Sequence, residues 1–232
     1  ALLGLHRESL AMLRCFATHQ TKARGWFTLW EINYDGSPMA CDYRDDENFW
    51  RNTAGMFDLL HGAYRMHRWT GDPVLVQDPL LQGFYARTVN EFVAEHDRNG
   101  NGIVDASSAN GWGIACTYNE LPGVVRTESA DCLGTQRRAF AAYAHFLQTN
   151  ADHSGAQTWM ANAERLKQVF NDTWYDAAAG RYRIGFDHPQ RRPVSAFGYE
   201  TSWFIPYTEL CEPGPRATAY LDFIHNSFQA KP

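Results

Sequence analysis

Residues 41–70, CDYRDDENFWRNTAGMFDLLHGAYRMHRWT, decide the architecture that the sequence predicts. They predict a helix over 48–69, with three consecutive carboxylates just before it and Trp50 in its first turn. Apolar side chains spread around much of its circumference instead of forming a single stripe. A helix that is apolar on several sides is packed on several sides. We therefore expect an inner helix of an all-helical assembly, with an acidic loop leading into its N-terminus.

The composition is that of a globular chain. With 232 residues, of which 44% are hydrophobic and 20% charged, one domain with a sizeable core is expected. The net charge of −5 argues against a basic surface for nucleic acid. No apolar run reaches the roughly 18 residues that a membrane-spanning helix needs. We therefore expect neither a nucleic-acid nor a membrane partner.

The five cysteines are widely spaced and form no C-x-x-C pair. An odd, scattered set argues against a disulfide framework or a zinc site and predicts mostly free, buried thiols. One bridge, between Cys41 and Cys116, stays open.

Helical periodicity predicts seven helices, and the loops between them alternate between long and short. The predicted helices cover 3–20, 48–69, 76–96, 131–149, 156–175 and 199–210, with a last one ending near 228. Small β-hairpins are expected in the long loops, at the turn Asp35-Gly36 and around 180–184. If consecutive helices are antiparallel, the three long loops lie on one face, at the N-termini of the second, fourth and sixth helices. This is the pattern of a ring of helical hairpins, in which inner and outer helices alternate.

The pattern of these segments resembles the six-hairpin glycosidase superfamily, whose (α/α)6 toroid occurs in trehalase-like, glucoamylase-like and α-L-rhamnosidase-like hydrolases. The resemblance is carried by RDDENFWRNTAGMFDLLHGAYRMHRWTGD (44–72), DRNGNGIVD (97–105), TYNELPG (117–123), ESADCLGTQRRAFAAYAHFL (128–147) and TWYDAAAGRYRIGF (173–186). It implies hydrolysis of an oligo- or polysaccharide by carboxylate acid/base catalysis. A full toroid has twelve helices. We therefore expect 1–232 to be a single, partial toroid-like domain, with the remaining half of the ring or a second copy as its partner.

The closest local likeness is to the acidic stretch of the rhamnosidase-like enzymes. There an Asp, an Arg and a Glu precede a Trp at the start of an inner helix, and Asp42, Arg44, Glu47 and Trp50 stand in that order here. The spacing to the tryptophan differs, and the proline that usually follows the cysteine is absent. The resemblance implies that Asp42 and Arg44 contact substrate.

Glycoside hydrolysis usually needs two carboxyl groups, about 5–5.5 Å apart for retention and about 6.5–9.5 Å for inversion, one of them with a raised pKa. Acidic residues stand in all three loops that lead into inner helices, next to aromatic residues that can stack on sugars. The predicted catalytic residues are Asp45, Asp46, Glu47, Glu120 and Glu200, and the predicted substrate contacts are Asp42, Arg44, Trp50, Trp112, Tyr118, Asn119 and Trp203.

Each group also has a structural interpretation. The triplet at 45–47 and Glu200 are acids that favour a helix N-terminus, whether or not they act on substrate. Glu128 and Asp131 lie at the entrance to the fourth helix, where Ser129 is the predicted N-cap.

Residues 97–105, DRNGNGIVD, match the first half of a D-x-[DN]-x-[DN]-G calcium loop. The expected glutamate at position twelve is missing, because Ser108 stands there, and Asp105 at position nine can replace it only in part. A calcium site formed by Asp97, Asn99, Asn101 and Asp105 is one interpretation, and a tight loop held by Asx turns without metal is the other. No other cofactor is expected.

Two other functions stay open. A polysaccharide lyase abstracts a proton with Tyr or His, for which Tyr118, Asn119, Arg126 and His145 are candidates, although the acid-rich loops disfavour an anionic polymer. The other is a non-catalytic helical scaffold that binds a glycan or a protein.

Overall fold

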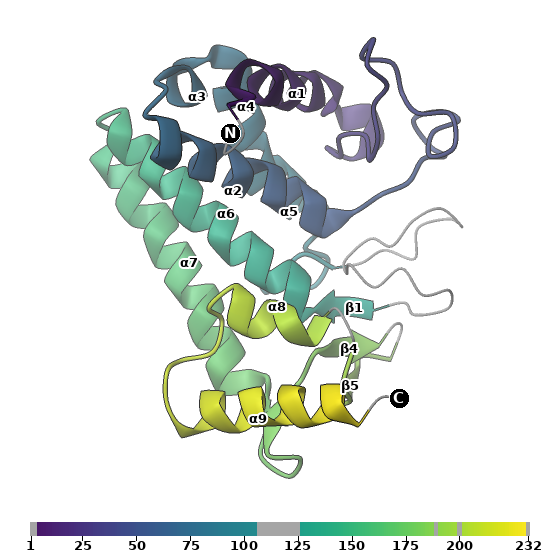
Figure 1. Ribbon diagram of the computed structural model, residues 1–232, viewed down its shortest axis with the longest axis vertical. Helices are drawn as coiled ribbons and strands as arrows, with labels where there is room; N and C mark the ends of the chain where they lie inside the picture. Colours follow the sequence, from purple (N-terminus) through teal and green to yellow (C-terminus); the bar gives the residue numbers. More distant parts are fainter. Residues whose placement is uncertain (1–3, 106–125, 188–189, 199–200, 231–232) are drawn as a thin grey trace.

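The computed structural model describes residues 4–105, 126–187, 190–198 and 201–230. Within these ranges the chain is mainly helical, with short antiparallel strands in the loops (Figure 1). The helices are α1 (His6–His19), the 3-10 turn η1 (Lys22–Arg24), α2 (Thr53–Thr70), α3 (Val74–Gln77), α4 (Pro79–Val89), α5 (Glu91–His96), α6 (Ala130–Thr149), α7 (His153–Thr173), α8 (Thr201–Tyr207) and α9 (Pro215–Gln229).

Three helices, α2, α6 and α8, form the centre of the fold. α6 packs against both α2 and α8, while α7 lies against α6 and α9 against α8. The chain enters α2, α6 and α8 from the same side, on the right in Figure 1. The predicted arrangement, with the N-termini of every second helix on one face, is therefore confirmed for these three helices.

The predicted helix 48–69 begins five residues late. Asn52 is extended, and its Oδ1 accepts a hydrogen bond from the N–H of Gly55, so the helix begins at Thr53. Trp50 thus lies in the preceding loop and not in the first turn, together with the acidic triplet, which was expected before the helix. The helix is nevertheless packed on several sides as expected, with Met56, Phe57 and Leu60 fully buried.

The predicted single helix over 76–96 is wrong. Asp78 is extended and its carboxylate caps Leu80, while Pro79 occupies the first position of α4. Proline lacks an N–H and disfavours helical geometry in the residue before it, so a continuous helix cannot pass this point. A second break at Asn90 separates α4 from α5.

Two small sheets lie in the loops. β1 (Arg126–Ser129), β4 (Gly185–Asp187) and β5 (Arg192–Val194) form an antiparallel sheet in the order β1-β4-β5, beside the N-terminus of α6. β2 (Tyr175–Asp176) and β3 (Arg181–Tyr182) form the hairpin predicted around 180–184. The hairpin predicted at Asp35-Gly36 is reduced to a single bridge between Ile32 and Pro38.

Cys132 is buried, whereas Cys15, Cys41 and Cys211 are free thiols that are not buried, so the expectation of mostly buried thiols is wrong for these three. Cys116 lies outside the described residues. Among the described helices, none combines the length and the apolar character needed to cross a membrane.

Close packing of α6 on the end of α8 yields a stability prediction. A Cβ at Gly134 would lie 2.7 Å from Cβ and 2.9 Å from Cγ2 of Thr208, whereas a Cβ at the exposed helical Gly62 would meet nothing within 4 Å. We expect Gly134→Ala to lower the free energy of unfolding by about 1–3 kcal/mol through overpacking. Gly62→Ala, the matched control, should raise it by about 0.5–1 kcal/mol through helix propensity.

Urea denaturation followed by circular dichroism checks both variants. Equal effects of the two substitutions would contradict the close contact between α6 and Thr208.

Candidate functional site

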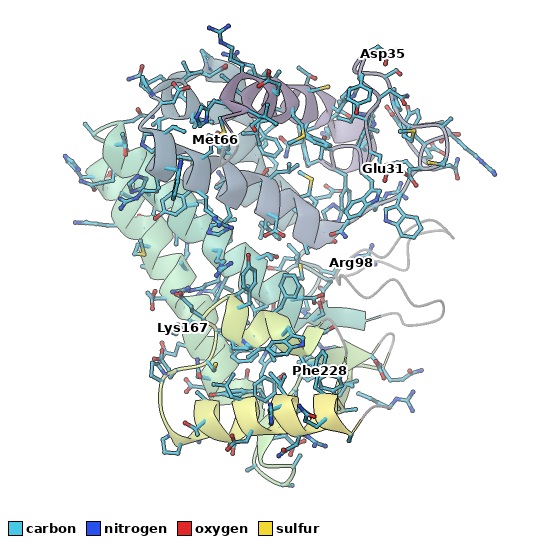
Figure 2. The ribbon with its side chains drawn as sticks, in the orientation of Figure 1. Glu31, Asp35, Met66, Arg98, Lys167 and Phe228 are labelled. Carbon is cyan, nitrogen blue, oxygen red and sulfur yellow. The ribbon has the colours of Figure 1, made fainter. Side chains whose placement is uncertain are left out.

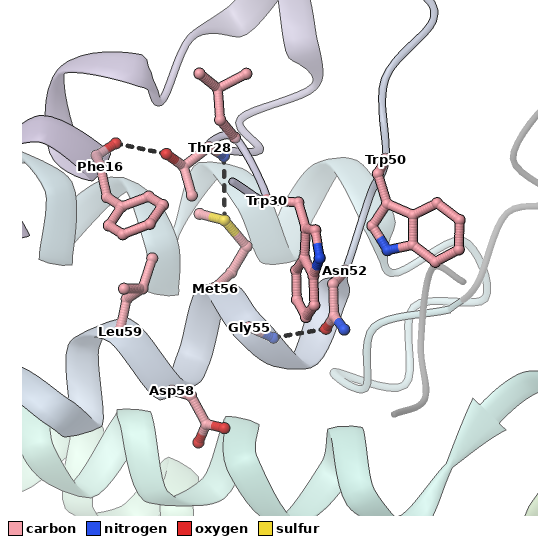
Figure 3. A pocket seen from close by; sticks show the side chains of 10 residues that line it. Phe16, Thr28, Trp30, Trp50, Asn52, Gly55, Met56, Asp58 and Leu59 are labelled. Carbon is pink, nitrogen blue, oxygen red and sulfur yellow. Dashed lines mark hydrogen bonds between the residues drawn. The ribbon is translucent and has the colours of Figure 1, made fainter. Parts of the chain in front are cut away.

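A cavity of about 270 Å³ lies beside the first two turns of α2, and we call it the α2 pocket. Two tryptophans, Trp30 and Trp50, give it aromatic walls, and Asn52 and Asp58 give it polar ones (Figure 3). Phe16, Met56 and Leu59 complete an apolar floor. An apolar cavity with a few convergent polar groups is the usual form of a small-molecule site.

Short hydrogen bonds fix the loop that carries Trp30 over α2. The N–H of Thr28 donates to Sδ of Met56 at 3.2 Å, and its hydroxyl donates to the carbonyl of Phe16 at 2.6 Å (Figure 3). A Cβ at Gly55 would meet the Trp30 ring at 3.6 Å, so the indole packs directly against the helix backbone. Trp30 and Asp58 were not predicted from the sequence, because nothing in their local pattern marks them.

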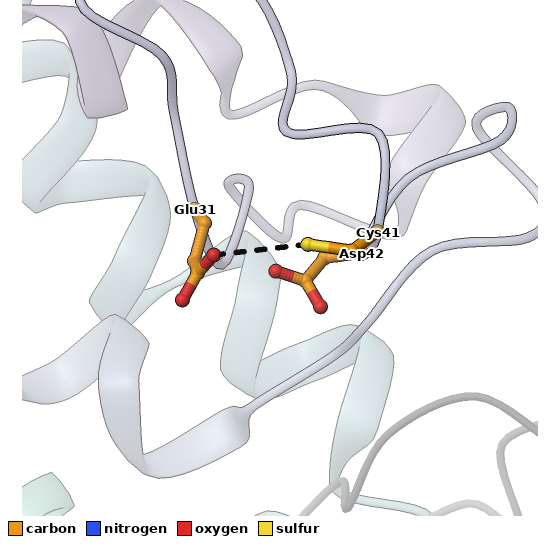
Figure 4. Close-up of side chains that lie close together, drawn as sticks. All are labelled: Glu31, Cys41 and Asp42. Atoms are coloured by element: carbon orange, nitrogen blue, oxygen red, sulfur yellow. Dashed lines mark hydrogen bonds between the residues drawn. The ribbon is translucent and has the colours of Figure 1, made fainter.

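A pair of carboxyl groups stands next to the pocket. Glu31 directly follows Trp30 in the sequence. One of its carboxylate oxygens, one carboxylate oxygen of Asp42 and Sγ of Cys41 all lie within 4.8 Å of one another (Figure 4). The hydrogen bond and the negative charge of Asp42 raise the pKa of Glu31 above its ordinary value. Burial first, and then the charge of Asp42, raises the pKa of Cys41.

Backbone hydrogen bonds join this pair to the pocket. The N–H of Met39 donates to the carbonyl of Glu31 at 3.3 Å, the N–H of Asp42 to the carbonyl of Met39 at 3.1 Å, and the N–H of Trp50 to the carbonyl of Asp42 at 2.7 Å. These three hydrogen bonds connect the segment that carries Trp30 and Glu31 to the segment that carries Asp42 and Trp50. The predicted substrate residues Asp42 and Trp50 are therefore brought together, along with a carboxylate that the sequence did not single out.

The acidic triplet is placed differently from the prediction. Oδ1 of Asp45 accepts hydrogen bonds from the side chain of Asn48 and from the N–H groups of Glu47 and Asn48, which lower its pKa. Glu47 is exposed.

Asp46 is also held in its ionised form. It accepts a hydrogen bond from the hydroxyl of Tyr43 and pairs with Arg24 at 2.7 Å, and both partners lower its pKa. The cation that pairs with Asp46 is Arg24, and the charge of Arg44 also lowers the pKa of Asp45. Two of the three acids do not have the raised pKa that suits a proton donor.

Residues around Asp97 form a second polar cluster. Within the loop, the carboxylate of Asp97 accepts the N–H groups of Gly100, Asn101 and Gly102. Glu128, 1% exposed on β1, accepts the side-chain amides of Asn99 and Asn101 at 3.0 and 2.8 Å and pairs with Arg191 at 2.8 Å.

At the start of α6, Ser129 stands at the predicted N-cap position but does not cap the backbone. Its hydroxyl donates instead to the buried carboxylate of Asp131, which also accepts the N–H of Cys132. On α8, Trp203 is 44% exposed, and its ring packs against that of Phe228 of α9 with centroids 5.4 Å apart. Phe228 is labelled in Figure 2.

Five predicted site residues lie outside the described residues: Trp112, Tyr118, Asn119, Glu120 and Glu200. Their roles stay predictions.

Comparisons with known proteins support the fold. No model of a protein family matches the sequence, and no curated protein matches it. A rhamnosidase from Klebsiella oxytoca, solved with rhamnose bound, has a similar structure, with a TM-score of 0.64 and 13% sequence identity. The similarity covers 98% of this chain and 38% of that chain. The predicted fold class, a mainly helical chain resembling a glycosidase toroid with small hairpins in its loops, is confirmed.

The carboxyl pair yields a prediction about ionisation. Asp42 raises the pKa of Glu31, so Asp42→Asn should lower the pKa of Glu31. The substitution removes the negative charge, and the new amide can donate a hydrogen bond to the Glu31 carboxylate. Carbon-13 NMR of the glutamate carboxyl groups, followed through an acid titration, measures this change. Asp35→Asn is the control, because Asp35 pairs with Ser37 and not with Glu31. An unchanged Glu31 pKa in Asp42→Asn would show that the pair is not coupled.

Proposed function

We propose that this chain belongs to a glycoside hydrolase of the six-hairpin type and that its α2 pocket binds a sugar ring. The observation that carries the proposal is a pocket walled by two indoles, with an amide and a carboxylate on its rim, at the N-terminal end of an inner helix. Aromatic faces pack against the C–H surface of a sugar, while polar side chains bind its hydroxyl groups. The chain spans 38% of the rhamnosidase that it resembles, so activity of the complete enzyme is part of the proposal.

Glu31 is our candidate for the general acid. A carboxyl group with a raised pKa stays protonated at a pH where an ordinary carboxyl group is ionised, and it can then donate its proton to the leaving oxygen. Asp42 would maintain that raised pKa. Asp58 lines the pocket from α2 and is our candidate for the partner carboxylate of Glu31, which stands next to the pocket.

The site residues predicted from the sequence have different roles in this proposal. Trp50 is a pocket wall, and Asp42 changes from substrate contact to partner of the acid. Asp45 and Asp46 hold the loop in place through Asn48 and Arg24, while Glu120 and Glu200 stay candidates for further carboxylates.

Aryl α-L-rhamnoside is the first substrate to test, because the similar solved structure is a rhamnosidase with rhamnose bound. Release of a reducing sugar would support hydrolysis. Release of an unsaturated product that absorbs in the ultraviolet would instead favour a lyase, and binding without turnover would favour a glycan-binding domain.

The two pocket tryptophans provide a direct test. Trp30→Ala and Trp50→Ala should each weaken sugar binding or kcat/KM by about 5- to 150-fold, since each removes one stacking surface worth about 1–3 kcal/mol. Trp69→Ala is the matched control, because Trp69 is 68% exposed and does not line the pocket. Titration calorimetry with the free sugar and the rhamnoside assay supply the readouts. Equal losses in all three variants would contradict a sugar site in the α2 pocket.

A further inference from the structure

The D-x-N-x-N-G loop at 97–105 is not used by the proposed function, and the structure supplies what its sequence lacks. In a calcium loop of this pattern, oxygens at positions one, three and five bind the ion, a glycine at position six makes the turn, and a bidentate glutamate closes the site from position twelve. Gly102, at position six, has φ +84°, the left-handed geometry that a tight turn requires. The glutamate is absent from the loop, where Ser108 stands.

Glu128 reaches the loop from a different element. It lies on β1, and its carboxylate is 1% exposed and points at the side chains of positions three and five. Its Oε1 lies 3.0 Å from Nδ2 of Asn99 and 2.8 Å from Nδ2 of Asn101. A buried carboxylate thus faces the same two residues that would share an ion with a glutamate at position twelve.

The cluster carries more negative than positive charge. Asp97, Asp105 and Glu128 are the carboxylates, and the last two are only 3% and 1% exposed. Among the described residues, the ion pairs of this cluster come from one cation, Arg191, whose Nη1 lies 2.8 Å from Glu128 and 3.5 Å from Asp105. Buried carboxylates are stable only when their charge is compensated, and one guanidinium compensates for only part of this charge.

We propose that Asp97, Asn99, Asn101, Asp105 and Glu128 form a Ca²⁺ site, with Glu128 as the glutamate that the loop lacks, and that Arg191 and Ca²⁺ compete for Glu128 and Asp105. The ligand atoms would all be oxygens, which suits a hard cation, and calcium accepts irregular oxygen geometry whereas magnesium demands a near-ideal octahedron. Rotation of the two asparagine amides by about half a turn would present Oδ1 in place of Nδ2 to the space beside Glu128. The rotation would break the hydrogen bonds that Oδ1 of Asn99 and of Asn101 now accept from the N–H groups of Asn101 and Ile103, so the bound ion has to compensate for their loss. Binding involves no covalent step.

Calorimetric titration of the whole chain with CaCl₂, after treatment with EDTA, tests the site. We expect one ion to bind per chain, with an accompanying rise in Tm. Glu128→Gln should weaken binding at least tenfold, because it replaces a charged ligand by a neutral one. Asp176→Asn is the matched control: Asp176 also accepts a loop N–H, from Ala179, but lies outside the cluster, so its loss should leave Ca²⁺ affinity unchanged.

Arg191→Gln separates this proposal from a purely structural loop. If Arg191 competes with Ca²⁺, this variant should have a lower Tm than the natural chain in EDTA, regain that Tm in excess CaCl₂, and bind Ca²⁺ several-fold more tightly. A purely structural ion pair predicts a Tm that stays low with or without Ca²⁺. The proposal is overturned if neither chain responds to CaCl₂, or if MgCl₂ at the same concentration gives the same response. The Arg191→Gln result stands even if Glu128→Gln fails to fold.

Discussion

The position of α6 between α2 and α8 is the constraint on which the rest of the structure depends. The first seven residues of α6 are buried, and the absence of a side chain at Gly134 lets Thr208 approach its backbone. On the other side, Phe146 lies against Tyr64 of α2. Because the chain enters all three helices from the same side, their N-termini lie on one side of the fold (Figure 1). The candidate site residues lie on that side because of how the helices pack, not because they are close in sequence.

The features of the sequence that depend on periodicity were predictable. The spread of apolar residues around α2 indicated an inner helix, and the alternation of loop lengths indicated which helix ends share a face. What periodicity could not show is where a helix begins when one side chain decides it. Asn52 and Asp78 each form a local hydrogen bond that sets a helix start, and only Pro79 gives a visible signal of it in the sequence.

The candidate site was predictable only in part, for a related reason. Asp42 and Trp50 lie close in sequence to the predicted inner helix, so the sequence alone could indicate them as site residues. Glu31 reaches Asp42 through hydrogen bonds of an irregular loop, and Glu128, 23 positions after Asp105 in the sequence, reaches the 97–105 loop from β1. Contacts of this kind follow from tertiary packing and leave no spacing in the sequence.

The acidic residues near the α2 pocket have two kinds of environment, one that lowers the pKa of a carboxyl group and one that raises it. Asp45 and Asp46 accept several hydrogen bonds, which favour the ionised form and fix the loop. Glu31 faces another carboxyl group, which favours the protonated form. Acid and base roles in one site require carboxyl groups whose pKa values are pushed in opposite directions. Here the hydrogen bonds of Asp45 and Asp46 fix the loop between Asp42 and Trp50, and Asp42 raises the pKa of Glu31. In the proposed function, two acids of the triplet therefore fix the loop that follows Asp42, and the proposed proton donor is a carboxyl group outside the triplet.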